Sequence, residues 1–134
     1  MIYVDSSALL KFVKRERETE ALRTWRRALP TEAEILTSNL AALEISRTLL
    51  RANIDHERVP YITGQALRGL YLVDVTSPVL ARARAYGIRR LGSLGAIHLA
   101  TADPFLTEMD AFVTYDVELA AAATELGLPV LAPA

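Results

Sequence analysis

The sequence predicts an α/β domain in which helices cover both faces of a central, mainly parallel sheet, forming a three-layer α/β/α sandwich. Short apolar runs of strand type alternate with longer helical segments along the whole chain, a pattern typical of parallel sheets. The chain has 134 residues, of which 51% are hydrophobic and 23% charged. This length supports one packed core, so residues 1–134 are expected to form a single domain.

The chain opens with an apolar run of strand length at residues 1–4. The hydroxyl groups of Ser6 and Ser7 can accept hydrogen bonds from free amide groups, so either residue is expected to cap a helix that includes residues 8–13. A charged segment with apolar residues at helical spacing follows at 16–29, which predicts an amphipathic helix.

A second short strand is expected at 35–37, after Pro30. Ser38 or Asn39 is then expected to cap a helix that continues to about residue 52. A further helix is expected over 56–68, although it contains a proline and a glycine.

The second half of the chain repeats this alternation. The expected elements are strands at 70–75, 110–114 and 129–133 and helices at 77–88, 96–102 and 116–126. Pro78 suits the first turn of its helix, Ser93 is expected to cap the next one, and Gly127 is expected to end the last.

Several classes of protein are excluded by what the sequence lacks. There is no cysteine, and His56 and His98 are too few for a zinc site of the usual kind. Any metal would therefore be bound through oxygen atoms, which favours Mg²⁺ or Mn²⁺. The phosphate-binding loop of nucleotide hydrolases and the glycine-rich dinucleotide turn are also absent. No apolar stretch reaches the length of about 18 residues that a membrane span needs, and no signal peptide is evident, so a cytoplasmic protein is expected.

Charge is distributed unevenly along the chain. All 15 basic residues lie at or before Arg90, where the net charge is +5, whereas residues 91–134 carry six acids and no base. A basic surface could face a polyanion while an acidic region gathers cations. The alternative is that these charges only solvate helix surfaces.

Three acids occupy positions at which a site is expected. Asp5 and Asp116 each follow a predicted strand, at the sheet edge where α/β proteins bind ligands. Glu44 lies among apolar residues of a predicted helix, where burial is unfavourable unless a cation meets the carboxylate. As alternatives, Asp5 and Asp116 could be helix caps, and Glu44 could pair with Arg47 or Arg51.

Four segments together resemble one known family. They are IYVDSSALLK, SNLAALEISRTL, LGSLGAIHLATA and DAFVTYDVELAAAATELGLPVLAP, and they span nearly the whole chain in order. The chain is similar to PIN-domain ribonuclease toxins of the VapC type. The resemblance implies an α/β/α fold, a cluster of three or four acids that binds Mg²⁺ or Mn²⁺, RNA cleavage, a VapB-type antitoxin as partner and a homodimer.

The family motif carries over position by position, with one departure. Asp5 matches the first acid, Glu44 the second and Asp116 the last, while Ser6 and Thr114 match supporting hydroxyl positions. Gly95 stands where the family has a further aspartate. Asp103 is a poor substitute, because eight residues along a helix correspond to about 12 Å of rise and about 80° of rotation. The resemblance therefore implies an endoribonuclease with impaired activity.

A second interpretation stays open beside this one. The chain could be a catalytically inactive PIN module that binds RNA or an antitoxin protein, and Gly95 is the residue that favours this interpretation. In either case the arginines that could hold an RNA backbone are Arg47, Arg51, Arg89 and Arg90.

Two further groups of residues are interpreted as packing. His98 lies in the apolar segment AIHLA, where a hydrogen-bonded core histidine is expected rather than a general base. Apolar residues of the first two helices could form a groove for a partner segment, but core packing is the expected role. These residues are Leu9, Phe12, Trp25 and Leu29.

Overall fold

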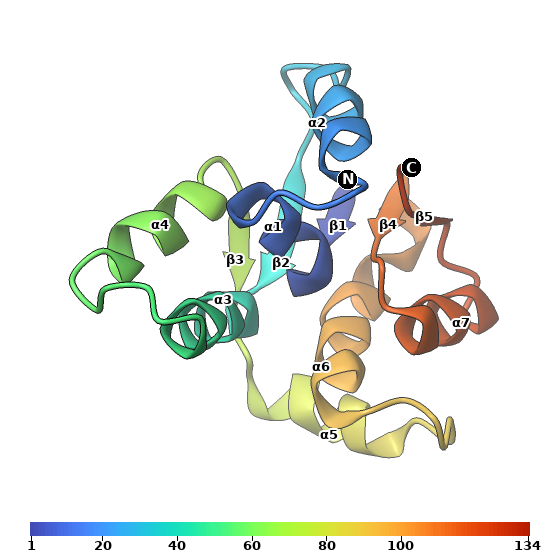
Figure 1. Cartoon of the computed structure of the whole chain (residues 1–134). Coiled ribbons are helices and arrows are strands. Elements are labelled where there is room, and N and C mark those ends of the chain that lie inside the picture. Colours follow the sequence, from blue (N-terminus) through green and yellow to red (C-terminus); the bar gives the residue numbers. More distant parts are fainter.

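The computed structural model describes all residues, 1–134, and contains one five-stranded sheet (Figure 1). The strands are β1 (Ile2–Val4), β2 (Ile35–Ser38), β3 (Tyr71–Val73), β4 (Ala111–Val113) and β5 (Val130–Leu131). Their order is β3-β2-β1-β4-β5, and every neighbouring pair is parallel. The α/β prediction is confirmed, and the sheet is parallel throughout.

Seven α-helices and one 3₁₀ helix accompany the sheet. They are α1 (Ser6–Val13), α2 (Thr19–Arg27), α3 (Leu40–Arg51), α4 (Val59–Ala66), α5 (Ser77–Ala85), α6 (Ser93–Ala102), the 3₁₀ helix η1 (Asp103–Glu108) and α7 (Val117–Glu125). None of them is long and apolar enough to cross a membrane.

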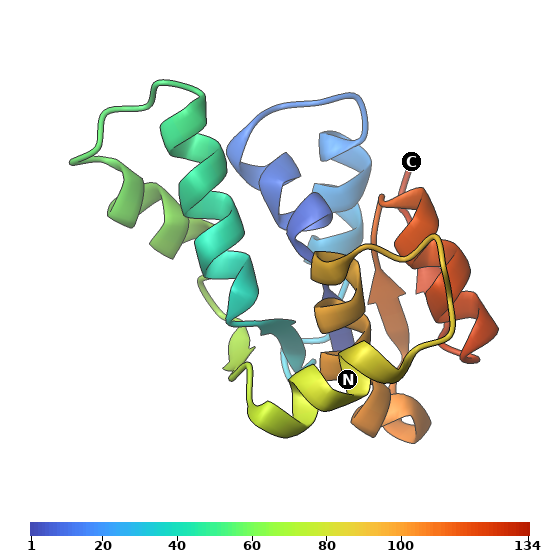
Figure 2. The same cartoon turned by 90° about the horizontal axis from the view of Figure 1, so that it is seen from below.

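Two separate hydrophobic clusters lie on the two faces of the sheet, because successive side chains of a strand point to opposite sides. Ile2 and Val4 of β1 pack with residues from helices α1 to α4. Tyr3, between them in the sequence, packs on the other side with residues from α6 and α7. Figure 2 shows α3 and α4 on one side of the molecule and α6 and α7 on the other. The three layers of the predicted sandwich are therefore present.

Two helices have boundaries that differ from the expected ones because of their local backbone geometry. The helix expected at 77–88 ends at Ala85, because the backbone of Tyr86 is extended (φ −64°, ψ 124°). The helix expected at 56–68 begins only at Val59, with Pro60 in its first turn, where a missing amide hydrogen is tolerated.

Two of the expected helix caps are wrong. Asp5, rather than Ser6 or Ser7, caps α1, and both serines lie inside that helix. Gly92 occupies the cap position of α6, without a side-chain hydrogen bond, and Ser93 is the first helical residue. At α3 the expected cap is present in part, since the Ser38 hydroxyl accepts from the Leu40 amide group at 3.1 Å.

Candidate functional site

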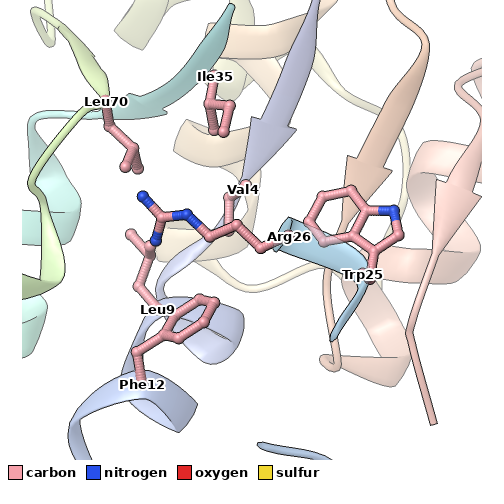
Figure 3. A pocket seen from close by; sticks show the side chains of 7 residues that line it. All are labelled: Val4, Leu9, Phe12, Trp25, Arg26, Ile35 and Leu70. Atoms are coloured by element: carbon pink, nitrogen blue, oxygen red, sulfur yellow. The ribbon is translucent and has the colours of Figure 1, made fainter. Parts of the chain in front are cut away.

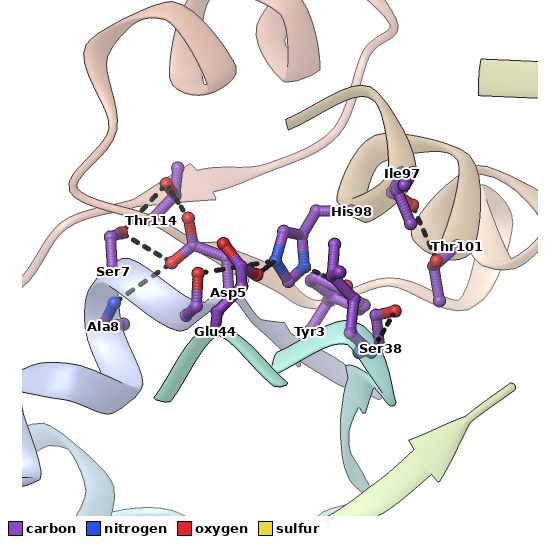
Figure 4. A network of polar contacts seen from close by, with 12 residues as sticks. Tyr3, Asp5, Ser7, Ala8, Ser38, Glu44, Ile97, His98, Thr101 and Thr114 are labelled. Atoms are coloured by element: carbon purple, nitrogen blue, oxygen red, sulfur yellow. Dashed lines mark hydrogen bonds and ion pairs between the residues drawn. The ribbon is translucent and has the colours of Figure 1, made fainter. Parts of the chain in front are cut away.

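Asp5 lies directly after β1 and is almost completely buried, with 2% of its surface exposed. Its carboxylate accepts hydrogen bonds from the Ser7 hydroxyl (2.6 Å), the Thr114 hydroxyl (2.6 Å) and the Ala8 amide group (3.1 Å), as Figure 4 shows. Burial raises the pKa of Asp5, and the hydrogen bonds from Ser7 and Thr114 oppose that rise. The carboxylate is thus held rigidly at the carboxyl end of the sheet, in an environment that favours a nearby positive charge.

Glu44 projects from α3 toward α6. Its Oε1 atom lies 2.7 Å from His98 Nε2, and the other carboxylate oxygen makes no hydrogen bond within the protein. The alternative pairing of Glu44 with Arg47 or Arg51 is absent, and both arginines are exposed. His98 is 2% exposed and also contacts the Tyr3 hydroxyl. The expectation of a hydrogen-bonded core histidine is therefore confirmed, and its partner is one of the candidate acids.

Asp116 lies between β4 and α7. Its Oδ1 atom accepts from the Leu119 amide group at 3.0 Å, so the aspartate is a helix cap, and its Oδ2 atom makes no hydrogen bond within the protein. Thr114 connects it to the first acid, because the Thr114 hydroxyl accepts from the Asp116 amide group (3.0 Å) and donates to Asp5. Asp5 and Asp116 thus combine the capping role with a place at the candidate site.

The two serines that follow Asp5 contact different residues of the candidate site. Ser6 Oγ lies 3.5 Å from His98 Nε2 and makes no hydrogen bond to an acid. Ser7, which was not selected, donates to Asp5 and accepts from the Tyr115 amide group at 2.9 Å. The helical position of Ser7 directs its hydroxyl back toward the preceding strand, and the sequence alone does not distinguish two adjacent serines in this respect.

Gly95 lies in the first turn of α6. A Cβ atom at this position would lie 3.0 Å from Leu91 Cδ1 and 3.9 Å from Leu119, and would meet no backbone. A Cβ atom is therefore accommodated if the Leu91 methyl group moves slightly. Asp103 does not replace the missing acid, because it accepts from the Tyr86 hydroxyl (2.7 Å) away from the other acids. No group of three or more acidic or histidine side chains lies close enough together to hold a metal ion.

The oxygen atoms at this edge of the sheet have the chemistry that Mg²⁺ and Mn²⁺ prefer. Asp5, Glu44 and Asp116 supply carboxylates from three elements, and two of these carboxylates each keep one oxygen without a hydrogen bond. The three acids have the donor chemistry that suits a hard divalent cation, although they do not form a close group of three metal ligands in this structure.

The arginines named from the sequence lie outside this cluster. All four are exposed: Arg47, Arg51, Arg89 and Arg90. Arg90 pairs with Glu118 at 3.3 Å, on the first turn of the helix that Asp116 caps. Such an exposed pair is weak and leaves the arginine accessible to a ligand.

The apolar residues of α1, of α2 and of the segment after α2 mostly pack into the core. Leu9 is 1% exposed, and Phe12, Trp25 and Leu29 pack against the same cluster, so the packing interpretation is confirmed. Figure 3 shows the Arg26 side chain crossing a small hollow that three of these residues help to line.

Comparison with known proteins agrees with this architecture. The family model described as "PIN domain" matches residues 2–125. Ribonuclease VapC47 of Mycobacterium tuberculosis is 40% identical over 136 residues, which cover 99% of this chain and 97% of the relative. The chain therefore belongs to the PIN-domain family, and within it to the VapC-type ribonuclease toxins.

Solved structures of low sequence identity show the same fold. VapBC2 from Rickettsia felis, bound to a DNA fragment from its promoter, has a TM-score of 0.73 at 12% identity and covers 100% of both chains. VapC20 of Mycobacterium tuberculosis, a toxin that cleaves the sarcin–ricin loop, has a TM-score of 0.72 at 16% identity and covers 91% of this chain and 95% of that one.

Proposed function

We propose that this protein is the toxin of a type II toxin–antitoxin pair and that it hydrolyses RNA with the help of Mg²⁺ or Mn²⁺. The observation that carries the proposal is the buried Asp5 carboxylate, held by three hydrogen bonds at the carboxyl end of β1 in a chain 40% identical to Ribonuclease VapC47. A buried carboxylate with a raised pKa at a ligand-binding sheet edge is typical of a functional site.

The acids and the hydroxyl groups of the site would have different roles. Asp5, Glu44 and Asp116 would hold the cation. A bound Mg²⁺ or Mn²⁺ ion would lower the pKa of a water molecule and offset the charge of the phosphodiester. Ser7 and Thr114 would keep the Asp5 carboxylate in one orientation through their 2.6 Å hydrogen bonds.

Gly95 makes this proposed site incomplete. The loss of one carboxylate ligand weakens cation binding, so we expect low catalytic activity in this chain. The same residue supports a second candidate function, a PIN module that binds RNA or an antitoxin without cutting. No three potential metal ligands lie close together in the structure, and this observation supports the second candidate function.

The proposed partners are RNA, a VapB-type antitoxin and a second copy of the chain. Exposed Arg47, Arg51, Arg89 and Arg90 would contact RNA phosphates. The antitoxin proposal rests on the similarity to VapBC proteins. The homodimer is proposed from the family resemblance, and sedimentation equilibrium tests it, since a mass of 14.7 kDa would contradict it.

RNA cleavage by purified variants separates the two candidate functions. With Mg²⁺ or Mn²⁺ we expect slow cleavage by the natural chain, faster cleavage by Gly95→Asp and none by Gly95→Asp combined with Asp5→Asn. Asn retains an acceptor for the Ala8 amide group, so this control preserves the helix cap. If the natural chain and Gly95→Asp both fail to cleave a broad set of RNAs, the nuclease proposal is wrong and the binding module remains.

A further inference from the structure

A continuous line of hydrogen bonds runs from the sheet to Glu44. The Ser38 amide group donates to the Tyr3 hydroxyl oxygen over 3.1 Å, and that hydroxyl lies 2.6 Å from His98 Nδ1. On the other side of the imidazole ring, Nε2 lies 2.7 Å from Glu44 Oε1 (Figure 4). The line joins β2, β1, α6 and α3, and it ends at a candidate site acid.

The positions of the protons follow from the partners. The Tyr3 oxygen accepts from the Ser38 amide group, so the hydroxyl has its own proton to donate, and His98 Nδ1 is the partner within reach. Thr37 Oγ1, a neighbouring buried oxygen, makes no hydrogen bond. His98 Nδ1 is therefore an acceptor, and Nε2 carries the hydrogen that is donated to Glu44.

Packing prevents the histidine from turning. Tyr3 is fully buried and its ring stacks on Phe112, with centroids 5.1 Å apart. The His98 ring meets the Tyr3 ring edge-on at 5.9 Å and is 2% exposed. Both rings are thus fixed by the hydrophobic cluster between the sheet and α6, whereas the Glu44 side chain is 18% exposed. Tyr3 and His98 therefore form the rigid part of the hydrogen-bonded line, and the Glu44 carboxylate is the group that His98 holds in place.

We infer that His98 is a positioning residue, which the Tyr3 hydroxyl holds in the Nε2–H tautomer so that His98 orients the Glu44 carboxylate toward the proposed cation. This inference rests on the proposed function only for the identity of that ligand. Both ring nitrogens are occupied, so His98 is not a general base. Gly95 lies one turn before His98 on the same side of α6. The helix therefore retains the histidine that would orient Glu44, although it lacks the aspartate that the family has at position 95.

Nitrogen-15 NMR of the metal-free protein at neutral pH tests the arrangement directly. We expect a hydrogen atom on Nε2, directed at Glu44, and none on Nδ1. Tyr3→Phe removes the hydroxyl beside Nδ1, so the His98 ring should become a mixture of its two tautomers. Glu44→Gln should shift the Nε2–H resonance. A ring protonated at Nδ1 in the natural chain, or a spectrum unchanged by both substitutions, would overturn the inference.

Mn²⁺ binding measured by titration tests the effect on the ligand, in the natural chain and in Gly95→Asp. His98→Met should weaken binding roughly 10- to 100-fold, because orienting partners of metal ligands contribute that much. His98→Gln, which retains an N–H donor near the Nε2 position, should restore most of the affinity. Thr63→Val is the matched control, since Thr63 is also a buried threonine and its hydroxyl contacts only Ser46 Oγ, at 3.1 Å and outside this line.

The two measurements separate the possible failures. Equal Mn²⁺ affinity in folded His98→Met and in its parent would overturn the positioning role while the proposed function stands. If no parent binds Mn²⁺, the proposed function fails, and the NMR spectra of the metal-free protein still decide whether His98 holds Glu44. If His98→Met does not fold, His98→Gln and Tyr3→Phe carry the same comparison.

Discussion

Asp5 has two roles that make opposite demands on its surroundings. As the cap of α1 it needs only an oxygen acceptor for the Ala8 amide group. As a carboxylate with 2% exposure it is unfavourable when ionised, and burial raises its pKa for that reason. A neutral side chain with an oxygen acceptor would cap α1 equally well. The negative charge of Asp5 therefore indicates a cationic ligand rather than a contribution to the stability of the fold.

Asp5→Asn should therefore stabilise the metal-free protein at neutral pH. A carboxyl group whose pKa is higher in the folded state favours folding when protonated, and this contribution is lost as the pH rises through the folded-state pKa. The asparagine variant does not lose it, so its urea midpoint should exceed that of the natural chain at pH 7. The advantage should shrink as the pH falls toward the ordinary aspartate pKa of about 4.

The matched control for this measurement is Asp74→Asn, because Asp74 is exposed and makes no side-chain hydrogen bond. That substitution should leave the midpoint unchanged at both pH values. An Asp5→Asn protein that is less stable than the natural chain at pH 7 would contradict the account of a costly buried charge.

At the scale of single elements, the alternation of short apolar runs with helical segments predicted the strands to within a few residues. The pattern is strongest for β1 and β4, which are fully buried. Helix ends were harder to predict. Thr76 caps α5 and Gly92 occupies the cap position of α6, and neither cap was identified, since several adjacent residues could serve equally well. For Asp116 the sequence left a cap and a metal ligand as two alternatives, because both roles require the same residue at the same place; the structure shows the cap.

Two substitutions of Asp116 separate these roles. Asp116→Ala removes the acceptor for the Leu119 amide group and should lower the free energy of unfolding by about 1 kcal/mol. Asp116→Asn retains the acceptor and should be nearly as stable as the natural chain. Both should reduce divalent-cation binding, because each removes the charge. Chemical denaturation and cation titration give the two readouts, and equal destabilisation by both variants would exclude the capping role.

At the scale of the whole molecule, the fold assembles a site from residues far apart in the sequence. Thr114 and Asp5 are separated by 109 positions and are joined by a 2.6 Å hydrogen bond, because β1 and β4 are parallel neighbours. Parallel strands made it possible to predict that Asp5 and Asp116 lie on the same edge. The contact between Glu44 and His98 was not predicted, since it depends on how α3 and α6 approach each other in space.

The most direct test of the account is Mn²⁺ affinity in three chains: the natural protein, Gly95→Asp and Gly95→Asp combined with Asp5→Asn. The account predicts weak binding by the first, at least roughly tenfold tighter binding by the second, and loss of that gain in the third, since a restored carboxylate adds a ligand and Asp5 anchors the site. Equal affinity in all three proteins would contradict the claim that Asp5, Glu44 and Asp116 form a divalent-cation site left incomplete by Gly95.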